Sequence, residues 1–135
     1  MLFKRFQRKT RPRVVAITVV RNEIDIVEPF VRHTATLVDH HLLIDHSSHD
    51  GTAEILNSLR AEGLGLTLFR SGDPAYNQPA ATNLLMRMAF DQHAADWVLP
   101  LDGDEFILPP DGTDLQSALT EAPKHSGCLT YPFRT

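Results

Sequence analysis

The feature that most constrains the fold is an uninterrupted apolar and β-branched run, residues 14–20, with the sequence Val-Val-Ala-Ile-Thr-Val-Val. A continuous run of this kind is typical of a strand that is covered on both faces in a parallel sheet. Three further apolar runs follow, at residues 42–44, 64–69 and 97–101, with stretches of helical spacing between them. Strands that alternate with helices predict an α/β fold with a mostly parallel sheet and helices on both faces.

The stretches between these strands predict three helices. We expect the first to hold Pro29 in its first turn, the second to be capped by Asp50, and the third to begin near Pro79. The third helix should bury a stripe made of Leu84, Leu85, Met88 and Ala89. A turn at residues 109–112, a short helix over 114–119 and a strand over 128–131 complete the expected elements.

Length and composition limit the class of protein. A chain of 135 residues that is 42% apolar can bury one core, so it forms one domain or part of one. It contains no apolar run of the roughly 18 residues that a membrane-spanning helix needs. Cys128 is the single cysteine, so an internal disulfide is excluded and we expect a reducing, cytoplasmic compartment.

Charge divides the chain into a basic tail, residues 1–13, and an acidic domain, residues 14–135. The tail holds six of the 13 basic side chains and no acid, which leaves seven basic against 17 acidic side chains in the domain. An acidic body argues against nucleic acid as the main ligand, because phosphate binding needs a basic face. Two interpretations of the tail stay open: a flexible, solvated terminus, or peripheral contact with the anionic inner face of a membrane.

Polar side chains follow three of the predicted strands. Arg21, Asn22 and Glu23 follow the first, Asp45 the second, and Asp102-Gly103-Asp104 the fourth. The carboxyl ends of parallel strands share one edge of the sheet, and ligands bind there where the strand order reverses. The sequence therefore predicts a binding site that these side chains build together.

Asp102 and Asp104 offer hard oxygen ligands, which suit Mn²⁺ or Mg²⁺. Such an ion commonly takes one or two protein carboxylates and fills its shell with water and substrate phosphates. The pair therefore predicts a phosphorylated partner, and Gly103 would allow that partner close to the backbone. A solvated acidic turn is the simpler alternative for these residues.

The other candidate residues each have two interpretations. Asp45 is placed to accept hydrogen bonds from a nucleobase or ribose, or to cap the turn that follows it. Arg21 is placed to donate to a phosphate, although a structural turn explains residues 21–23 equally well.

Two function classes fit parts of this pattern without any family resemblance. Asp39-His40-His41 spells a triplet that occurs in manganese-dependent phosphoesterases, but there it ends a strand, whereas here it precedes the apolar residues 42–44. A non-catalytic module that binds nucleotide or a divalent metal is the other alternative.

The ordered set of motifs resembles the family 2 glycosyltransferases, which have the GT-A fold with a Rossmann-like nucleotide-binding half. The matching pieces are Val19 to Glu23, Ile44 to Thr52, and Asp96 to Phe106, the last containing Asp-Gly-Asp-Glu-Phe. The similarity is greatest to the branch in which Arg-Asn-Glu leads into a helix that ends near a histidine, here His33. One departure is His46, which stands where many members have a second acid.

The resemblance implies an enzyme that transfers a sugar, with inversion and with the help of a metal, from a nucleotide diphosphate sugar to an unknown acceptor. A UDP-sugar is the favoured donor. Asn22 and Glu23 would line the nucleotide side of the cleft, Asp45 would face the base, and Asp102 and Asp104 would face the ribose and the metal-bridged diphosphate. The family's general base lies well beyond the Asp-x-Asp motif, so we expect it beyond residue 135 and expect this domain to be an incomplete, amino-terminal portion that is inactive alone.

Overall fold

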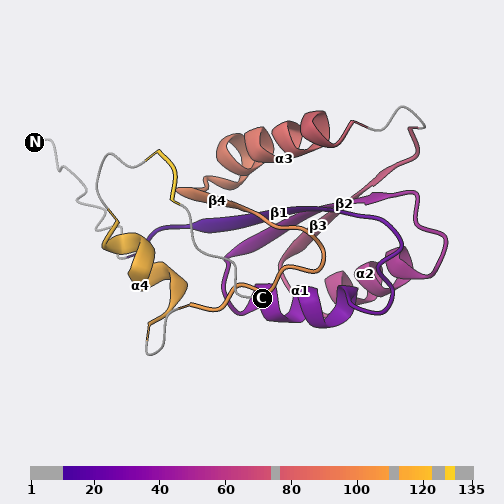
Figure 1. Ribbon diagram of the computed structural model, residues 1–135, viewed down its shortest axis with the longest axis horizontal. Helices are drawn as coiled ribbons and strands as arrows, with labels where there is room; N and C mark the ends of the chain where they lie inside the picture. The colour runs from indigo at the N-terminus through magenta and orange to yellow at the C-terminus, as the bar shows by residue number, and fades with distance from the viewer. Residues whose placement is uncertain (1–10, 74–76, 110–112, 123–126, 130–135) are drawn as a thin grey trace, which may run out of the picture.

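A computed structural model describes residues 11–73, 77–109, 113–122 and 127–129 (Figure 1). The described elements follow one another as β1 (Val14–Val20), α1 (Val27–Ala35), β2 (His40–His46), α2 (Thr52–Ala61), β3 (Leu66–Ser71), α3 (Gln78–His93), β4 (Trp97–Pro100) and α4 (Leu115–Thr120). The strands form a sheet in the order β3-β2-β1-β4, and each neighbouring pair is parallel. The predicted α/β class is confirmed.

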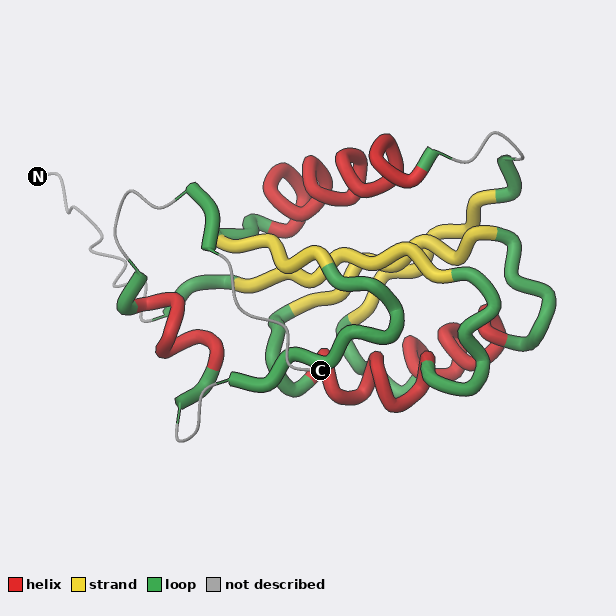
Figure 2. The backbone as a smooth tube through the Cα atoms, in the orientation of Figure 1, coloured by secondary structure: helices red, strands yellow, loops and turns green. Residues whose placement is uncertain are grey.

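Helices cover both faces of the sheet, as predicted. Figures 1 and 2 show α3 on one face and α1 with α2 on the other. The side chains of β1 alternate between the two resulting cores: Val14 and Ala16 pack on the α1 and α2 side, whereas Val15 and Ile17 pack on the α3 side. The continuous apolar run of β1 therefore reflects a central strand that has no solvent-facing side.

Several predicted boundaries differ from the observed ones. The second strand is longer than residues 42–44, because His40 and His41 also pair with β1. The third begins at Leu66, two residues later than predicted, after Gly65 with a φ of 60°. In α3, Leu85 and Ala89 are buried as expected, but Leu84 is 55% exposed, so the predicted stripe was too wide.

The starts of α2 and α3 show how local chemistry sets the helix ends. Asn77 caps α3, since its side chain accepts a hydrogen bond from the Ala80 amide at 3.1 Å. The N-cap of α2 is Gly51, with a φ of 102°, rather than the predicted Asp50. Asp50 still accepts a hydrogen bond from the Thr52 amide at 3.0 Å. The Thr52 hydroxyl also donates to this carboxylate, which lowers the pKa of Asp50.

The basic amino-terminal segment is described from Arg11 onward. Arg11 forms an ion pair with Asp39 at 2.7 Å, and the Nε of Arg13 donates to the carbonyl oxygen of His93 at 2.6 Å. These two arginines are thus attached to the domain, whereas the other four basic residues of the segment lie outside the described residues. Membrane contact through the segment stays a prediction.

Two other predictions concern the ends of the described chain. Residues 128 and 129 are not in a strand, and the rest of the predicted strand, like residues 110–112 of the predicted turn, lies outside the described residues. Within the described part of the chain, no helix is both long enough and apolar enough to cross a membrane.

Candidate active site

The carboxyl ends of β1, β2 and β4 meet at one edge of the sheet. Val20, the last residue of β1, is in register with Asp45 near the end of β2. A cavity of about 390 Å³ at this edge is lined by residues at or just after the ends of three different strands, among them Arg21, Glu23, His46, Asp102 and Asp104. Most of the predicted site residues therefore share one cavity.

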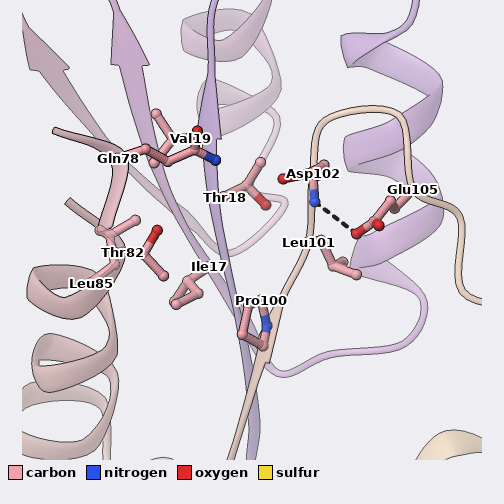
Figure 3. A pocket seen from close by; sticks show the side chains of 10 residues that line it. All are labelled: Ile17, Thr18, Val19, Gln78, Thr82, Leu85, Pro100, Leu101, Asp102 and Glu105. Carbon is pink, nitrogen blue, oxygen red and sulfur yellow. Dashed lines mark hydrogen bonds between the residues drawn. The ribbon is translucent and has the colours of Figure 1, made fainter. Parts of the chain in front are cut away.

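A second cavity opens where β4 separates from β1. Pro100 pairs with Ile17, and the Leu101 amide donates to the Ile17 carbonyl oxygen at 3.0 Å, but β1 continues to Val20 without β4. The resulting space of about 240 Å³ lies between β1, the start of α3 and the chain after β4 (Figure 3). Its polar lining residues include Thr18, Gln78, Thr82, Asp102 and Glu105. Because β2 and β4 flank β1 on opposite sides, this is the position where the strand order reverses.

The acidic turn, residues 102–105, is held by its own hydrogen bonds. The Glu105 amide donates to the Asp102 carbonyl oxygen at 3.0 Å. The Glu105 carboxylate in turn accepts a hydrogen bond from the Asp102 amide at 2.9 Å (Figure 3). Asp102 and Asp104 are exposed, and their carboxylates accept no hydrogen bond from any described residue. Glu105 therefore shapes the turn, and the two aspartates are left available for a ligand.

Gly103 lets the acidic turn approach the end of β1. A Cβ atom at this position would lie 3.3 Å from Cγ1 of Val20 and 3.6 Å from Cγ of Glu23. The sequence analysis explained this glycine by the close approach of a ligand, which stays a prediction. In the structure, the absence of a side chain at Gly103 allows the acidic turn to pack against Val20 and Glu23.

Asp45 is buried beneath the edge of the sheet. Its side chain is 0% exposed, and the distance from Oδ2 to the Ser48 amide is a long 3.4 Å. Oδ1 has no hydrogen-bond partner among the described residues. A buried oxygen without a partner costs free energy, so this carboxylate has unused capacity to accept a hydrogen bond. Contact between Asp45 and a nucleobase stays a prediction, and Asp45 lines neither of the two cavities.

The loop after β1 is joined to the loop after β2. The Asn22 amide donates to the Ser48 hydroxyl at 2.9 Å, and Oδ1 of Asn22 accepts from the His49 amide at 2.8 Å. The Glu23 amide donates to the Thr52 hydroxyl at 2.9 Å. Asn22 adopts a φ of 52°, which asparagine tolerates better than most residues. Asn22 thus has a structural contact, while Arg21 and Glu23 line the larger cavity.

The Asp-His-His triplet lies at the start of β2, away from the edge that carries the cavities. Asp39 binds Arg11 and also accepts a hydrogen bond from the Val14 amide at 2.8 Å. His40 pairs with the Thr67 hydroxyl at 2.8 Å and His41 with the Thr18 hydroxyl at 2.9 Å. Each of the three side chains therefore has a structural partner at the start of β2, which argues against the phosphoesterase hypothesis.

A divalent metal fits the residues of the acidic turn. No group of three or more acidic, histidine or cysteine side chains in the described residues is arranged to hold a metal by itself. Two available carboxylates are nevertheless the donor set of an ion that completes its shell with water and phosphate oxygens. The chemistry of Asp102 and Asp104 thus matches Mn²⁺ or Mg²⁺ bound together with a phosphorylated ligand.

The fold is an α/β domain with a parallel sheet, and in such domains ligands bind at the carboxyl edge of the sheet, where both cavities lie. The sequence profile of glycosyl transferase family 2 matches residues 15–134, so the chain belongs to this family. The predicted resemblance is confirmed. A comparison with curated proteins found no match.

Among solved structures, the chain is similar to the mannosyltransferase PcManGT from Pyrobaculum calidifontis, which was determined in complex with GDP-Man and Mn²⁺. The two are 25% identical, with a TM-score of 0.56 over 70% of this chain. The chain spans 28% of the length of that mannosyltransferase.

Sequence reasoning missed three residues of the site. Thr18 was treated only as part of the buried strand, Gln78 was not singled out, and Glu105 was quoted only as part of the Asp-Gly-Asp-Glu-Phe motif. The spacing of three between Asp102 and Glu105 is a signal for a side-chain hydrogen bond across a tight turn, and it was available in the sequence.

Proposed function

We propose that this chain forms the donor-binding part of a glycosyltransferase that uses a nucleotide diphosphate sugar. The observation that carries the proposal is the pair of exposed carboxylates, Asp102 and Asp104, at the position where the strand order reverses. Membership of glycosyl transferase family 2 supports sugar transfer, and the GDP-Man and Mn²⁺ bound to the mannosyltransferase support a nucleotide sugar with a divalent metal.

In this proposal Asp102 and Asp104 hold Mn²⁺ or Mg²⁺, a Lewis acid that would stabilise the charge of the departing diphosphate. Arg21, exposed on the wall of the larger cavity, is placed to donate charge-assisted hydrogen bonds to phosphate oxygens. Glu105 keeps the turn folded through the Asp102 amide. An inverting outcome and a base from beyond residue 135 remain parts of the proposal that rest on the family resemblance.

A binding experiment can distinguish between uracil and guanine as the nucleobase of the donor. The sequence interpretation favoured a UDP-sugar, whereas the similar mannosyltransferase was determined with GDP-Man. Binding to the intact protein is therefore measured by calorimetric titration and thermal unfolding with UDP and with GDP, each with and without Mn²⁺. A ligand at about 100 times its dissociation constant stabilises the folded state by roughly 2.7 kcal/mol.

Asp104→Asn is the test variant and Asp91→Asn the matched control. Asp91 is an exposed carboxylate in the last turn of α3 that lines neither cavity. We expect Asp104→Asn to abolish the metal-dependent stabilisation and Asp91→Asn to keep it. Equal nucleotide binding with and without the metal, or binding that survives Asp104→Asn, would contradict the proposal. Nucleotide binding by the intact protein without sugar transfer or donor hydrolysis would instead support a non-catalytic binding module.

A further inference from the structure

The segment that follows the acidic turn crosses α1 and is held there by side chains. Residues 106–109 have no regular secondary structure, and no backbone-to-backbone hydrogen bond involves residues 106–108 within the described ranges. Nε2 of His33, in the last turn of α1, lies 2.7 Å from the carbonyl oxygen of Ile107. A carbonyl oxygen only accepts, so Nε2 of His33 is the donor.

Aromatic rings support the same contact. The ring of Phe106 meets the ring of Phe30 edge to face, with 6.1 Å between centroids, and lies 5.4 Å from the ring of His33. Phe30 is a fully buried residue of α1, so its ring is a fixed surface against which Phe106 packs. Edge-to-face rings at such distances attract beyond the area that they bury. Phe106 is therefore fixed to α1 although it is 41% exposed.

The contact lies close to the proposed metal ligands along the chain. Asp104 precedes Ile107 by three residues, and the Glu105 carboxylate binds the Asp102 amide. The acidic turn is thus held before Asp102 by the Leu101 bond to β1, within itself by Glu105, and after Glu105 by His33. Removal of the His33 hydrogen bond would leave this end of the turn held by the ring contacts of Phe106 alone.

We propose that His33 is a positioning residue for Asp102 and Asp104: its Nε2–H holds the Ile107 carbonyl and so fixes the acidic turn in the geometry that binds a metal-diphosphate. The inference rests on the proposed function, because it assigns His33 to the same site. His33 touches neither of the two cavities, and it acts through the backbone of the turn.

Three variants separate the hydrogen bond from overall stability. His33→Gln keeps an N–H donor at a similar reach from Cβ, and His33→Leu keeps apolar bulk without a donor. Val31→Ala, which removes methyl groups from a buried core position of α1, destabilises the same helix and changes none of the contacts to the turn described above.

The first measurement is amide hydrogen exchange of the metal-free protein at Asp102 and Glu105, the two amides that are hydrogen-bonded within the turn. We expect exchange to be about fivefold faster in His33→Leu and near the wild-type rate in His33→Gln. The second measurement is the affinity for Mn²⁺ with the nucleoside diphosphate that the wild type binds. It should fall about fivefold in His33→Leu and stay within about twofold in His33→Gln and Val31→Ala.

The outcomes decide between positioning and a purely structural role. Wild-type exchange and affinity in His33→Leu would overturn the proposal, and so would equal losses in His33→Gln or Val31→Ala. If the wild type binds no metal-nucleotide, the proposed function fails, and the exchange rates alone then decide whether His33 orders the turn.

Discussion

His41 makes the stability of the fold sensitive to acid. Its side chain is 2% exposed, its Nε2 pairs with the Thr18 hydroxyl, and its ring lies against Phe30 with 5.7 Å between centroids. Burial in this environment disfavours the imidazolium and, with a smaller contribution from the charge on His40, lowers the pKa of His41 from 6.5 to about 3. The folded state therefore keeps His41 neutral at a pH where the unfolded chain binds a proton.

The sign and size of the effect follow from proton linkage. Because the pKa is lower in the folded state, the contribution of His41 is fully present above pH 6.5 and is lost as the pH falls toward about 3. Each pH unit within that window removes about 1.4 kcal/mol from the free energy of unfolding. Between pH 7 and pH 5 the loss is about 2 kcal/mol. Burial also lowers the pKa of His40, which acts in the same direction.

Urea unfolding of the wild type and of His41→Gln at pH 7 and pH 5 measures this contribution. Glutamine does not titrate, so the wild type should lose about 2 kcal/mol more than the variant between the two pH values. His40 is present in both proteins and largely cancels in the difference. An equal loss in the two proteins would refute the argument and would show that His41 is not kept neutral by burial.

Two further predictions concern the acidic turn and Phe30, the buried ring that contacts the segment after it. Gly103→Ala should displace the turn, because the new Cβ would lie 3.3 Å from Val20, and faster exchange of the Glu105 amide would report it. Gly127→Ala, where a Cβ would meet nothing within 4 Å, is the control, and unchanged exchange in Gly103→Ala would contradict the packing role. Phe30→Ala should lower the free energy of unfolding by about 3–5 kcal/mol in urea unfolding, since the ring is fully buried between the sheet and the segment after β4. A loss below about 1 kcal/mol would exclude Phe30 as a core residue.

The order of the elements and the shared edge of the sheet were predictable, because they depend on patterns that are local in the sequence. The apolar run of β1 indicated a doubly covered strand, and the polar residues after three of the strands indicated the edge of the sheet that carries both cavities. The start of β2 was not predictable in this way. His40 and His41 are polar in the sequence, but within the sheet they pair with Thr67 and Thr18, which apolar periodicity does not detect.

The details of the site depend on contacts between residues that are distant in the sequence. The burial of Asp45 follows from the register of β2 against β1 and β3, which only the assembled sheet sets. The role of Gly103 depends on the position of Val20, and the role of His33 depends on the path of the chain past Ile107. A motif identifies which side chains take part in such a site, while packing decides which of them face the ligand.

The central position of β1 also has a consequence for the order of assembly. β1 is the first of the described strands to be synthesised. Its pairing of Val15 with His40 closes a loop of 25 residues, whereas its pairing of Val14 with Trp97 closes one of 83 residues. The longer closure costs roughly 1 kcal/mol more in chain entropy, so β2 should join β1 before β4 does. Asp102 and Asp104, which follow β4, then reach the edge of a sheet that has already formed. During synthesis, the cavity between β1 and the chain after β4 forms only when β4, the last of the described strands, joins the sheet.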